Sequence, residues 1–234
     1  MGLPAGSHPA LTRRAMEAAE LQPSILSEDP LVIQFDSFLN EAEASEMVSI
    51  AQAAGFTESE VLQRGLQGGA GGKMDWLKSA HRDSQTTFCT PKCYASPTIG
   101  TLLGRAQRFL HMGPEHTELQ FLQYFGGQYY RTHSDYLSGS EKLLGGPRVL
   151  TLLMYLSEVD EGGETHFPAI NLTVHPRAGR AVLWPSVLNA EPLTKDVRTR
   201  HQALPVMRGT KYAANLWYYH RDIWAASELG CMGG

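Results

Sequence analysis

The sequence contains no run of apolar residues that approaches the roughly 20 residues needed to span a bilayer. It also lacks any block of about five or more lysines and arginines, and its formal net charge is −4. We therefore expect neither a membrane span in this chain nor a nucleic-acid partner. The N-terminal stretch has no apolar segment typical of a secretory signal. With 42% hydrophobic and 19% charged residues over 234 positions, the composition is that of an ordinary globular protein.

Cysteine is scarce. The three cysteines are Cys89, Cys93 and Cys231, and an odd number argues against a complete disulfide framework. Cys89 and Cys93 are close enough in sequence for a short disulfide, and two free thiols fit the same spacing equally well. A zinc site would need two more ligands, which no neighbouring Cys-x-x-Cys or His-x-x-x-His motif supplies.

The first half of the chain predicts two helices. Residues 1–30 are rich in Ala, Pro and Glu without a clear period, and we interpret them as an extension, partly helical and partly mobile. Residues 31–39 have the content of a strand. A helix is expected to begin after Asn40, a good N-cap, and to end at Gly55. A second amphipathic helix is expected over residues 97–112.

A glycine-rich segment lies between the two predicted helices. Five glycines occupy positions 65–72, and such a tract holds a fixed backbone only at a high entropic cost. The segment 57–80 is therefore either a lid over a binding site or a solvated linker.

The second half of the chain predicts a sheet. From residue 119 onward, short apolar or alternating runs are separated by Gly, Pro, Asn and Asp. Such runs at regular spacing favour a sandwich, a jelly roll or a barrel. We therefore expect an α+β protein in which two helices precede an all-β half.

The motif His-x-Asp occurs three times, so a single occurrence carries little weight. The pairs are His81/Asp83, His133/Asp135 and His220/Asp222. His81 lies in a polar segment, where a surface charge is the favoured interpretation. His220 is followed by too few residues for a further ligand downstream.

The pair His133 and Asp135 lies in an aromatic strand, where residues two apart project from the same face. The two side chains either satisfy each other or form part of a metal site. His201 lies on a later predicted strand, and Lys211 follows it by ten residues. Two imidazoles and one carboxylate are the ligands of non-haem Fe(II) oxygenases, which keep open positions for a chelating co-substrate and dioxygen. A buried lysine suits the far carboxylate of a dicarboxylic keto acid.

Residues 31–222 resemble the prolyl 4-hydroxylase branch of the Fe(II)/2-oxoglutarate dioxygenases. The family pattern is Tyr-x-x-Gly-Gln, His-x-Asp, Gly-Gly-Glu-Thr, and then a distal His followed ten positions later by Lys. All of these elements are present in order, within YFGGQYYRTHSDY, RVLTLLMYLSEVDEGGETHFP, VHPRAGRAVLWPS and HQALPVMRGTKYAANLWYY.

The resemblance implies roles for individual residues. It implies that His133, Asp135 and His201 bind iron and that Lys211 pairs with the distal carboxylate of 2-oxoglutarate. Further implied positions are Tyr124 and Thr165 near the same carboxylate, and Arg82, Glu118, Arg148 and Trp217 at or near a peptide groove. The family often has a histidine two residues after the Trp, and this chain has Tyr219 there instead.

The resemblance also implies a fold. It is a double-stranded β-helix, or jelly roll, with N-terminal helices packed on one sheet. The catalytic domain would span residues 31–222, preceded by the extension 1–30 and followed by a tail, 223–234. Residues 57–80 and 138–148 fill the positions of two flexible loops that close over the substrate.

The implied activity is hydroxylation of prolyl residues at C4, coupled to decarboxylation of 2-oxoglutarate to succinate. Its cofactors would be Fe(II) and 2-oxoglutarate, with ascorbate as reductant. Its partners would be a proline-rich peptide or protein and dioxygen. The resemblance suggests the endoplasmic reticulum or secretory pathway, with any signal or anchor absent from this chain. The alternatives are a dioxygenase that acts on a free amino acid or another small molecule, and a non-catalytic jelly-roll binding module.

Overall fold

An eight-stranded antiparallel sheet forms the middle layer of the molecule. The computed structural model describes residues 3–64, 74–77 and 80–228. The strand order in this sheet is β1-β2-β14-β10-β17-β8-β7-β3. Its strands are β1 (Pro23–Glu28), β2 (Leu31–Phe35), β3 (Thr57–Glu58), β7 (Gln85–Phe88), β8 (Thr117–Tyr124), β10 (Arg148–Tyr155), β14 (Ala181–Pro185) and β17 (Lys211–Tyr219).

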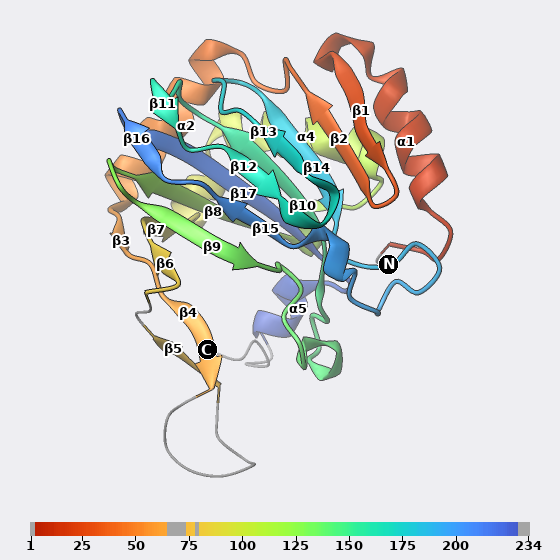
Figure 1. The fold of residues 1–234 in the computed structure, drawn as a ribbon. Helices are drawn as coiled ribbons and strands as arrows, with labels where there is room; N and C mark the ends of the chain where they lie inside the picture. Colours follow the sequence, from red (N-terminus) through yellow and green to blue (C-terminus); the bar gives the residue numbers. More distant parts are fainter. Residues whose placement is uncertain (1–2, 65–73, 78–79, 229–234) are drawn as a thin grey trace.

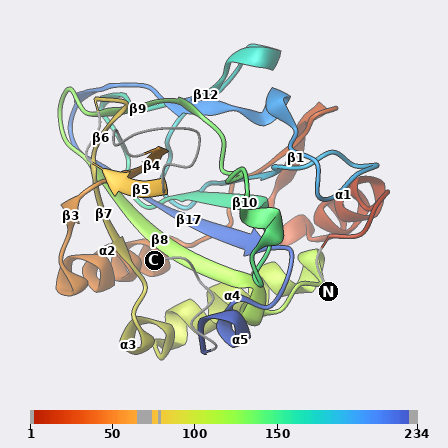
Figure 2. The same ribbon diagram turned by 90° about the horizontal axis from the view of Figure 1, so that it is seen from below.

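A five-stranded antiparallel sheet, in the order β13-β12-β15-β9-β6, faces the first (Figures 1 and 2). Its strands are β6 (Arg82–Asp83), β9 (Tyr129–His133), β12 (Thr165–Phe167), β13 (Leu172–Val174) and β15 (His201–Ala203). Two small ribbons pair β11 (Glu161–Gly162) with β16 (Val206–Arg208), and β4 (Val61–Arg64) with β5 (Met74–Leu77). The two facing antiparallel sheets confirm the expected jelly-roll core.

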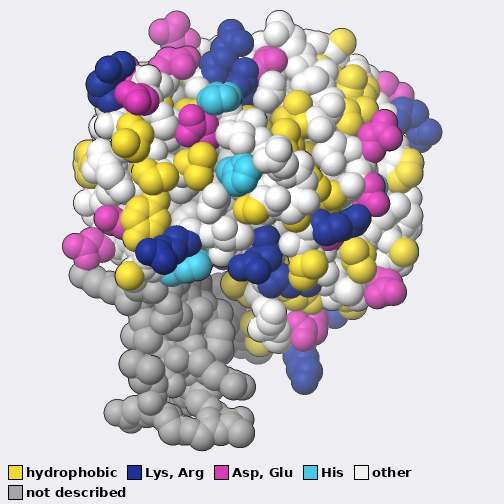
Figure 3. Space-filling model, in the orientation of Figure 1, with side chains coloured by type: hydrophobic (Ala, Val, Ile, Leu, Met, Phe, Trp, Pro, Cys, Tyr) yellow, Lys and Arg dark blue, Asp and Glu magenta, His cyan; other side chains and the backbone are white. Residues whose placement is uncertain are grey.

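Helices cover the opposite face of the large sheet (Figure 2). They are α1 (His8–Glu17), α2 (Glu41–Ala54), α3 (Pro91–Tyr94), α4 (Pro97–Leu110) and α5 (Ile223–Glu228). Short 3₁₀ turns occur at η1 (Ala19–Leu21), η2 (Pro114–His116), η3 (Ser140–Lys142), η4 (Pro168–Ile170) and η5 (Val197–Thr199). Among the described residues, no helix is both long and apolar enough to cross a bilayer. Hydrophobic, basic and acidic side chains are mixed over the face shown in Figure 3.

Local signals explain why the two predicted helices form. The Asn40 side chain accepts a hydrogen bond from the Glu43 amide, and the Glu43 carboxylate accepts one from the Asn40 amide, both at 2.9 Å. This capping box satisfies donors that the first turn of α2 leaves free. Helix α4 begins with a simpler cap, in which Ser96 Oγ accepts a hydrogen bond from the Thr98 amide. A salt bridge of 2.6 Å between Arg105 and Glu43 joins the two helices.

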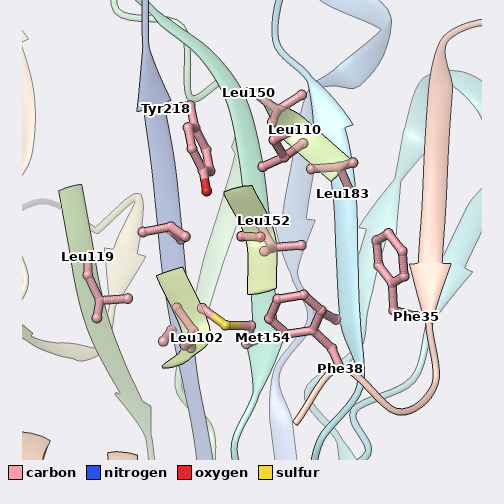
Figure 4. Packing of buried hydrophobic residues seen from close by; sticks show 14 of the residues in the cluster. Phe35, Phe38, Leu102, Leu110, Leu119, Leu150, Leu152, Met154, Leu183 and Tyr218 are labelled. Atoms are coloured by element: carbon pink, nitrogen blue, oxygen red, sulfur yellow. The ribbon is translucent and has the colours of Figure 1, made fainter. Parts of the chain in front are cut away.

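The main hydrophobic core lies between these helices and the large sheet. Figure 4 shows Leu102 and Leu110 of α4 directed toward Leu150, Leu152 and Met154 of β10. All five side chains are at most 3% exposed. Burial of this apolar surface fixes the helices on one face and leaves the other face of the large sheet to the smaller sheet. The expected packing of N-terminal helices on one sheet is confirmed.

Residues 8–28, which the sequence placed in an extension, contribute α1 to this core and β1 to the edge of the large sheet. Strand β1 pairs with β2, and Leu11 and Ala15 of α1 are fully buried. Cys89 and Cys93 form a disulfide, which decides between the two interpretations of their spacing. Within the glycine-rich segment, β4 and β5 pair as a ribbon, whereas residues 65–73 and 78–79 lie outside the described part of the chain.

Candidate active site

Three predicted metal ligands meet at the edge where β9 and β15 pair. Strand β9 ends at His133, β15 begins at His201, and these two residues are register partners. Asp135 follows β9 by two residues. One ligand atom from each residue lies within 4.8 Å of the others. The Nε2 atoms of His133 and His201 lie 3.7 and 3.8 Å from the Asp135 carboxylate. These distances are too long for hydrogen bonds, so a self-satisfying His–Asp pair is not formed.

Backbone carbonyls orient both imidazoles. His133 Nδ1 lies 2.9 Å from the Arg131 carbonyl oxygen, and His201 Nδ1 lies 3.1 Å from that of Thr199. A carbonyl oxygen only accepts, so each Nδ1 donates, and in the neutral form of each ring Nε2 has a lone pair on the side of Asp135. Such outer contacts fix the ring orientation of histidines that bind metals.

The charges of His133 and Asp135 match a metal site. Burial lowers the pKa of His133 well below its usual value, and the nearby His201 ring acts in the same direction. A neutral imidazole is the form that binds a metal. Burial opposes ionisation of Asp135, but His201, His133 and the Thr151 hydroxyl hold the pKa of its carboxyl below the usual value. Thr151 donates to Asp135 Oδ2 at 2.6 Å.

Aromatic side chains hold the two rings in place. Tyr130 stacks on His133 with ring centroids 3.5 Å apart, and Trp184 packs edge-on against His201 at 4.7 Å. Two imidazoles and one carboxylate, held on one side of a cavity, form the ligand set of non-haem Fe(II). The residues present therefore fit an Fe(II) ion.

The triad opens into a cavity of about 400 Å³, which Lys211 also lines. The Lys211 side chain is 2% exposed, and its Nζ donates to the Gly163 carbonyl at 2.7 Å. The amine lies 5.2 Å from the centre of the Tyr124 ring. Tyr124 is the register partner of Lys211 on β8. Burial lowers the pKa of Lys211 to about 7, while Glu164 opposes this effect. When protonated, the amine keeps two donors for an anionic ligand. Thr165 also lines this cavity.

A polar cluster surrounds Arg148 at the same cavity. Its guanidinium donates through Nε to Tyr219 Oη at 2.9 Å and through Nη2 to Glu118 Oε2 at 2.8 Å. Tyr219 in turn donates to Glu118 at 2.8 Å. The guanidinium carbon lies 3.5 Å from the centroid of the Trp217 ring. Tyr219, which stands where the family often has a histidine, therefore holds Arg148 in position.

The structure brings nearly all predicted site residues to this one cavity. Of the ten, nine line the cavity, and Glu118 instead supports Arg148; the nine are Arg82, Tyr124, His133, Asp135, Arg148, Thr165, His201, Lys211 and Trp217. The interpretation of His81 as a surface charge is wrong, because its ring is partly buried, lines the cavity and packs edge-on against Tyr130.

Sequence reasoning missed Gln120, Tyr130 and Asn215 as cavity residues. Gln120 and Tyr124 lie an even number of residues apart on β8 and so point to the same face. The same is true of Asn215, Lys211 and Trp217 on β17. The period of a strand would therefore have placed two of the missed residues on the site's face.

Comparisons with known proteins agree with this geometry. Residues 119–219 match the family model of the 2OG-Fe(II) oxygenase superfamily. The chain is 32% identical over 216 residues to probable prolyl 4-hydroxylase 3 of Arabidopsis thaliana, covering 83% of this chain and 71% of that protein. It is 31% identical over 218 residues to prolyl 4-hydroxylase 1 of the same plant, covering 86% and 73%.

Solved structures share the fold. The viral collagen prolyl hydroxylase of Paramecium Bursaria Chlorella virus-1, in its complex with 2OG, superposes with a TM-score of 0.62 at 24% identity, covering 80% of this chain and 95% of that one. A prolyl-4-hydroxylase of Pseudomonas putida gives a TM-score of 0.57 at 18% identity, covering 90% and 99%.

Proposed function

Because the chain belongs to the prolyl 4-hydroxylase family of Fe(II)- and 2-oxoglutarate-dependent oxygenases, we propose that it hydroxylates prolyl residues of peptides or proteins at C4. The reaction consumes dioxygen and converts 2-oxoglutarate to succinate and CO₂. The observation that carries the proposal is the meeting of His133, Asp135 and His201 with the buried Lys211 in one cavity.

The protein's part in the reaction begins with its cofactors. His133, Asp135 and His201 would hold Fe(II), which when bound supplies the oxidative chemistry that couples decarboxylation to hydroxylation. Lys211 would bind the distal carboxylate of 2-oxoglutarate, with Tyr124 and Thr165 beside it. Ascorbate is the expected reductant.

The rest of the cavity would hold the substrate. Arg148 is fixed by Glu118, Tyr219 and Trp217, so it presents a rigid donor surface to a peptide carbonyl. Arg82 lies over the Tyr130 ring at 4.7 Å, which adds another cationic and aromatic wall. A proline-rich segment suits such walls because it is already extended and loses little entropy on docking.

Product analysis tests the proposal. The protein is incubated with Fe(II), 2-oxoglutarate, ascorbate and a proline-containing peptide, and mass spectrometry follows the gain of one oxygen atom on proline and the release of succinate. We expect hydroxyproline in the peptide. Free proline, offered in parallel, tests the small-molecule alternative, since hydroxylation of free proline alone would contradict the proposal. A binding module would form no succinate with either substrate, and a His201→Ala variant controls for metal-independent oxidation.

A further inference from the structure

Two amide side chains, Gln120 and Asn215, lie opposite each other in the cavity. Gln120 is 4% exposed, and its Oε1 is buried without a partner among the described residues. Asn215 is its register partner on β17, so both side chains project from the same face of the sheet into the cavity. A buried amide without partners is costly, and natural proteins rarely keep one unless a ligand or water completes it.

Strand β17 carries a second unpartnered group. Trp217 is 5% exposed, and its Nε1 donor is also without a partner among the residues described. Asn215 and Trp217 are two residues apart and both lie on the inner face of β17. Gln120 lies across from Asn215 on β8. Together they present both donors and acceptors, which is the combination that a peptide group requires.

The co-substrate does not account for these groups. Asn215 stands four residues after Lys211 on one strand, which places their backbones about 13 Å apart at about 3.3 Å per residue. A small dicarboxylate bound at Lys211 does not span that distance. The amide pair therefore faces another ligand.

Gln120 also marks the junction of two cavities. A second cavity of about 880 Å³ lies beside the first, and both are lined by Glu60, Phe88 and Gln120. Phe88 is 43% exposed at this junction. A ligand that contacts Gln120 can therefore continue past Phe88 into the second cavity, as an extended chain does and a free amino acid does not.

We propose that Gln120 and Asn215 form an amide subsite that hydrogen-bonds a backbone peptide group on one side of the target proline, with the flanking chain passing Phe88 into the second cavity. The proposal rests on the proposed function. Because the Gln120 carbonyl needs an N–H donor and proline has none, the subsite selects a non-proline residue at the contacting position.

The chain offers a matched pair of variants. Gln120→Met removes the amide with little change of shape. Gln123→Met makes the same replacement on the opposite face of β8, where the Gln123 amide donates to Tyr212 Oη at 2.7 Å. Thermal unfolding provides a first readout. We expect Gln120→Met to keep or raise the melting temperature, since the buried Gln120 Oε1 has no hydrogen bond to lose among the described residues, and Gln123→Met to lower it.

Peptide kinetics provide the decisive readout. For a long proline-containing peptide, we expect Gln120→Met to raise KM about tenfold, the worth of one hydrogen bond, while the KM for 2-oxoglutarate stays unchanged. Trimming the peptide on one side should abolish this difference. N-methylation of a single backbone amide should weaken the wild-type reaction by a similar factor but leave Gln120→Met unaffected.

The outcomes separate the two proposals. If wild-type protein forms no hydroxyproline in any peptide, the proposed function fails and the subsite with it. If hydroxyproline forms, but Gln120→Met and Gln123→Met share the wild-type KM at every peptide length, only the amide subsite is refuted. The amide subsite is also refuted if every singly N-methylated peptide affects the wild type and Gln120→Met equally.

Discussion

Replacement of Lys211 by methionine should stabilise the protein in the absence of its cofactors. The side chain is 2% exposed, and burial lowers its pKa to about 7 from the usual 10.5. At 1.36 kcal/mol for each pKa unit, keeping the amine charged inside the cavity costs roughly 5 kcal/mol. At pH 7, half of the folded molecules carry the Lys211 proton, and burial of Lys211 then destabilises the fold by about 4 kcal/mol. The variant also loses the hydrogen bond to Gly163, which lowers its stability by about 1 kcal/mol.

The net gain of Lys211→Met is therefore about 3 kcal/mol at pH 7. For a chain of this size that corresponds to a melting temperature roughly 6–12 °C higher. The sign depends on pH. The unfolded chain keeps the lysine proton up to about pH 10.5, whereas the folded protein releases it near pH 7. Wild-type stability thus rises with pH across this window, and the advantage of the variant is largest below pH 7 and vanishes toward pH 10.

Thermal unfolding of metal-free protein between pH 6.5 and pH 10 measures this difference. Lys142→Met, at an exposed lysine, serves as the control and should change neither the melting temperature nor its pH dependence by much. In the presence of Zn(II) as an inert metal, 2-oxoglutarate should stabilise the wild type and leave Lys211→Met unchanged. Equal melting temperatures of wild type and Lys211→Met at pH 7, with parallel pH dependence, would refute the argument from burial.

Three further substitutions probe other parts of the site and fold. Asp135→Ala should reduce metal affinity by at least about 100-fold and abolish turnover while keeping the fold, and tight metal binding by this variant would contradict the triad. Tyr219→Phe should raise the KM for peptide by up to about tenfold, because Arg148 loses one of its two side-chain hydrogen-bond partners. The KM for 2-oxoglutarate should not change, and steady-state kinetics with each substrate test both expectations. Replacing Cys89 and Cys93 by serine should cost about 2 kcal/mol of stability, read as a lower denaturation midpoint, and an unchanged midpoint would contradict it.

The helices could be predicted from the sequence because their signals are local. The capping box at Asn40 and Glu43 is readable from residue types three positions apart. Strand β1 could not be predicted in the same way, because its burial does not alternate regularly and its place depends on pairing with β2. The disulfide could not be decided either, since the Cys89–Cys93 spacing allows both oxidation states.

The metal ligands were predicted by order and resemblance, but their convergence depends on non-local pairing. His133 and His201 become neighbours only because β9 and β15 pair in register. The role of His81 was misjudged for the same reason. Its own segment is polar, and only the pairing of β6 with β9 brings its ring to the cavity against Tyr130.

The register of β8 with β17 orders the proposed site from one end to the other. Lys211 pairs with Tyr124 at the end proposed for the co-substrate, Asn215 pairs with Gln120, and Trp217 pairs with Glu118 beside Arg148. Because side chains alternate along a strand, a slip of one residue would turn the whole row into the core beneath α4 and replace it with apolar groups. The packing of Leu216 and Leu119 on that opposite face, both fully buried, therefore holds the reactive face in place. Large-to-small changes at these two leucines should lower stability and weaken the binding of both 2-oxoglutarate and peptide. Changes at Lys211 should affect only the 2-oxoglutarate site, and changes at Gln120 only the peptide site.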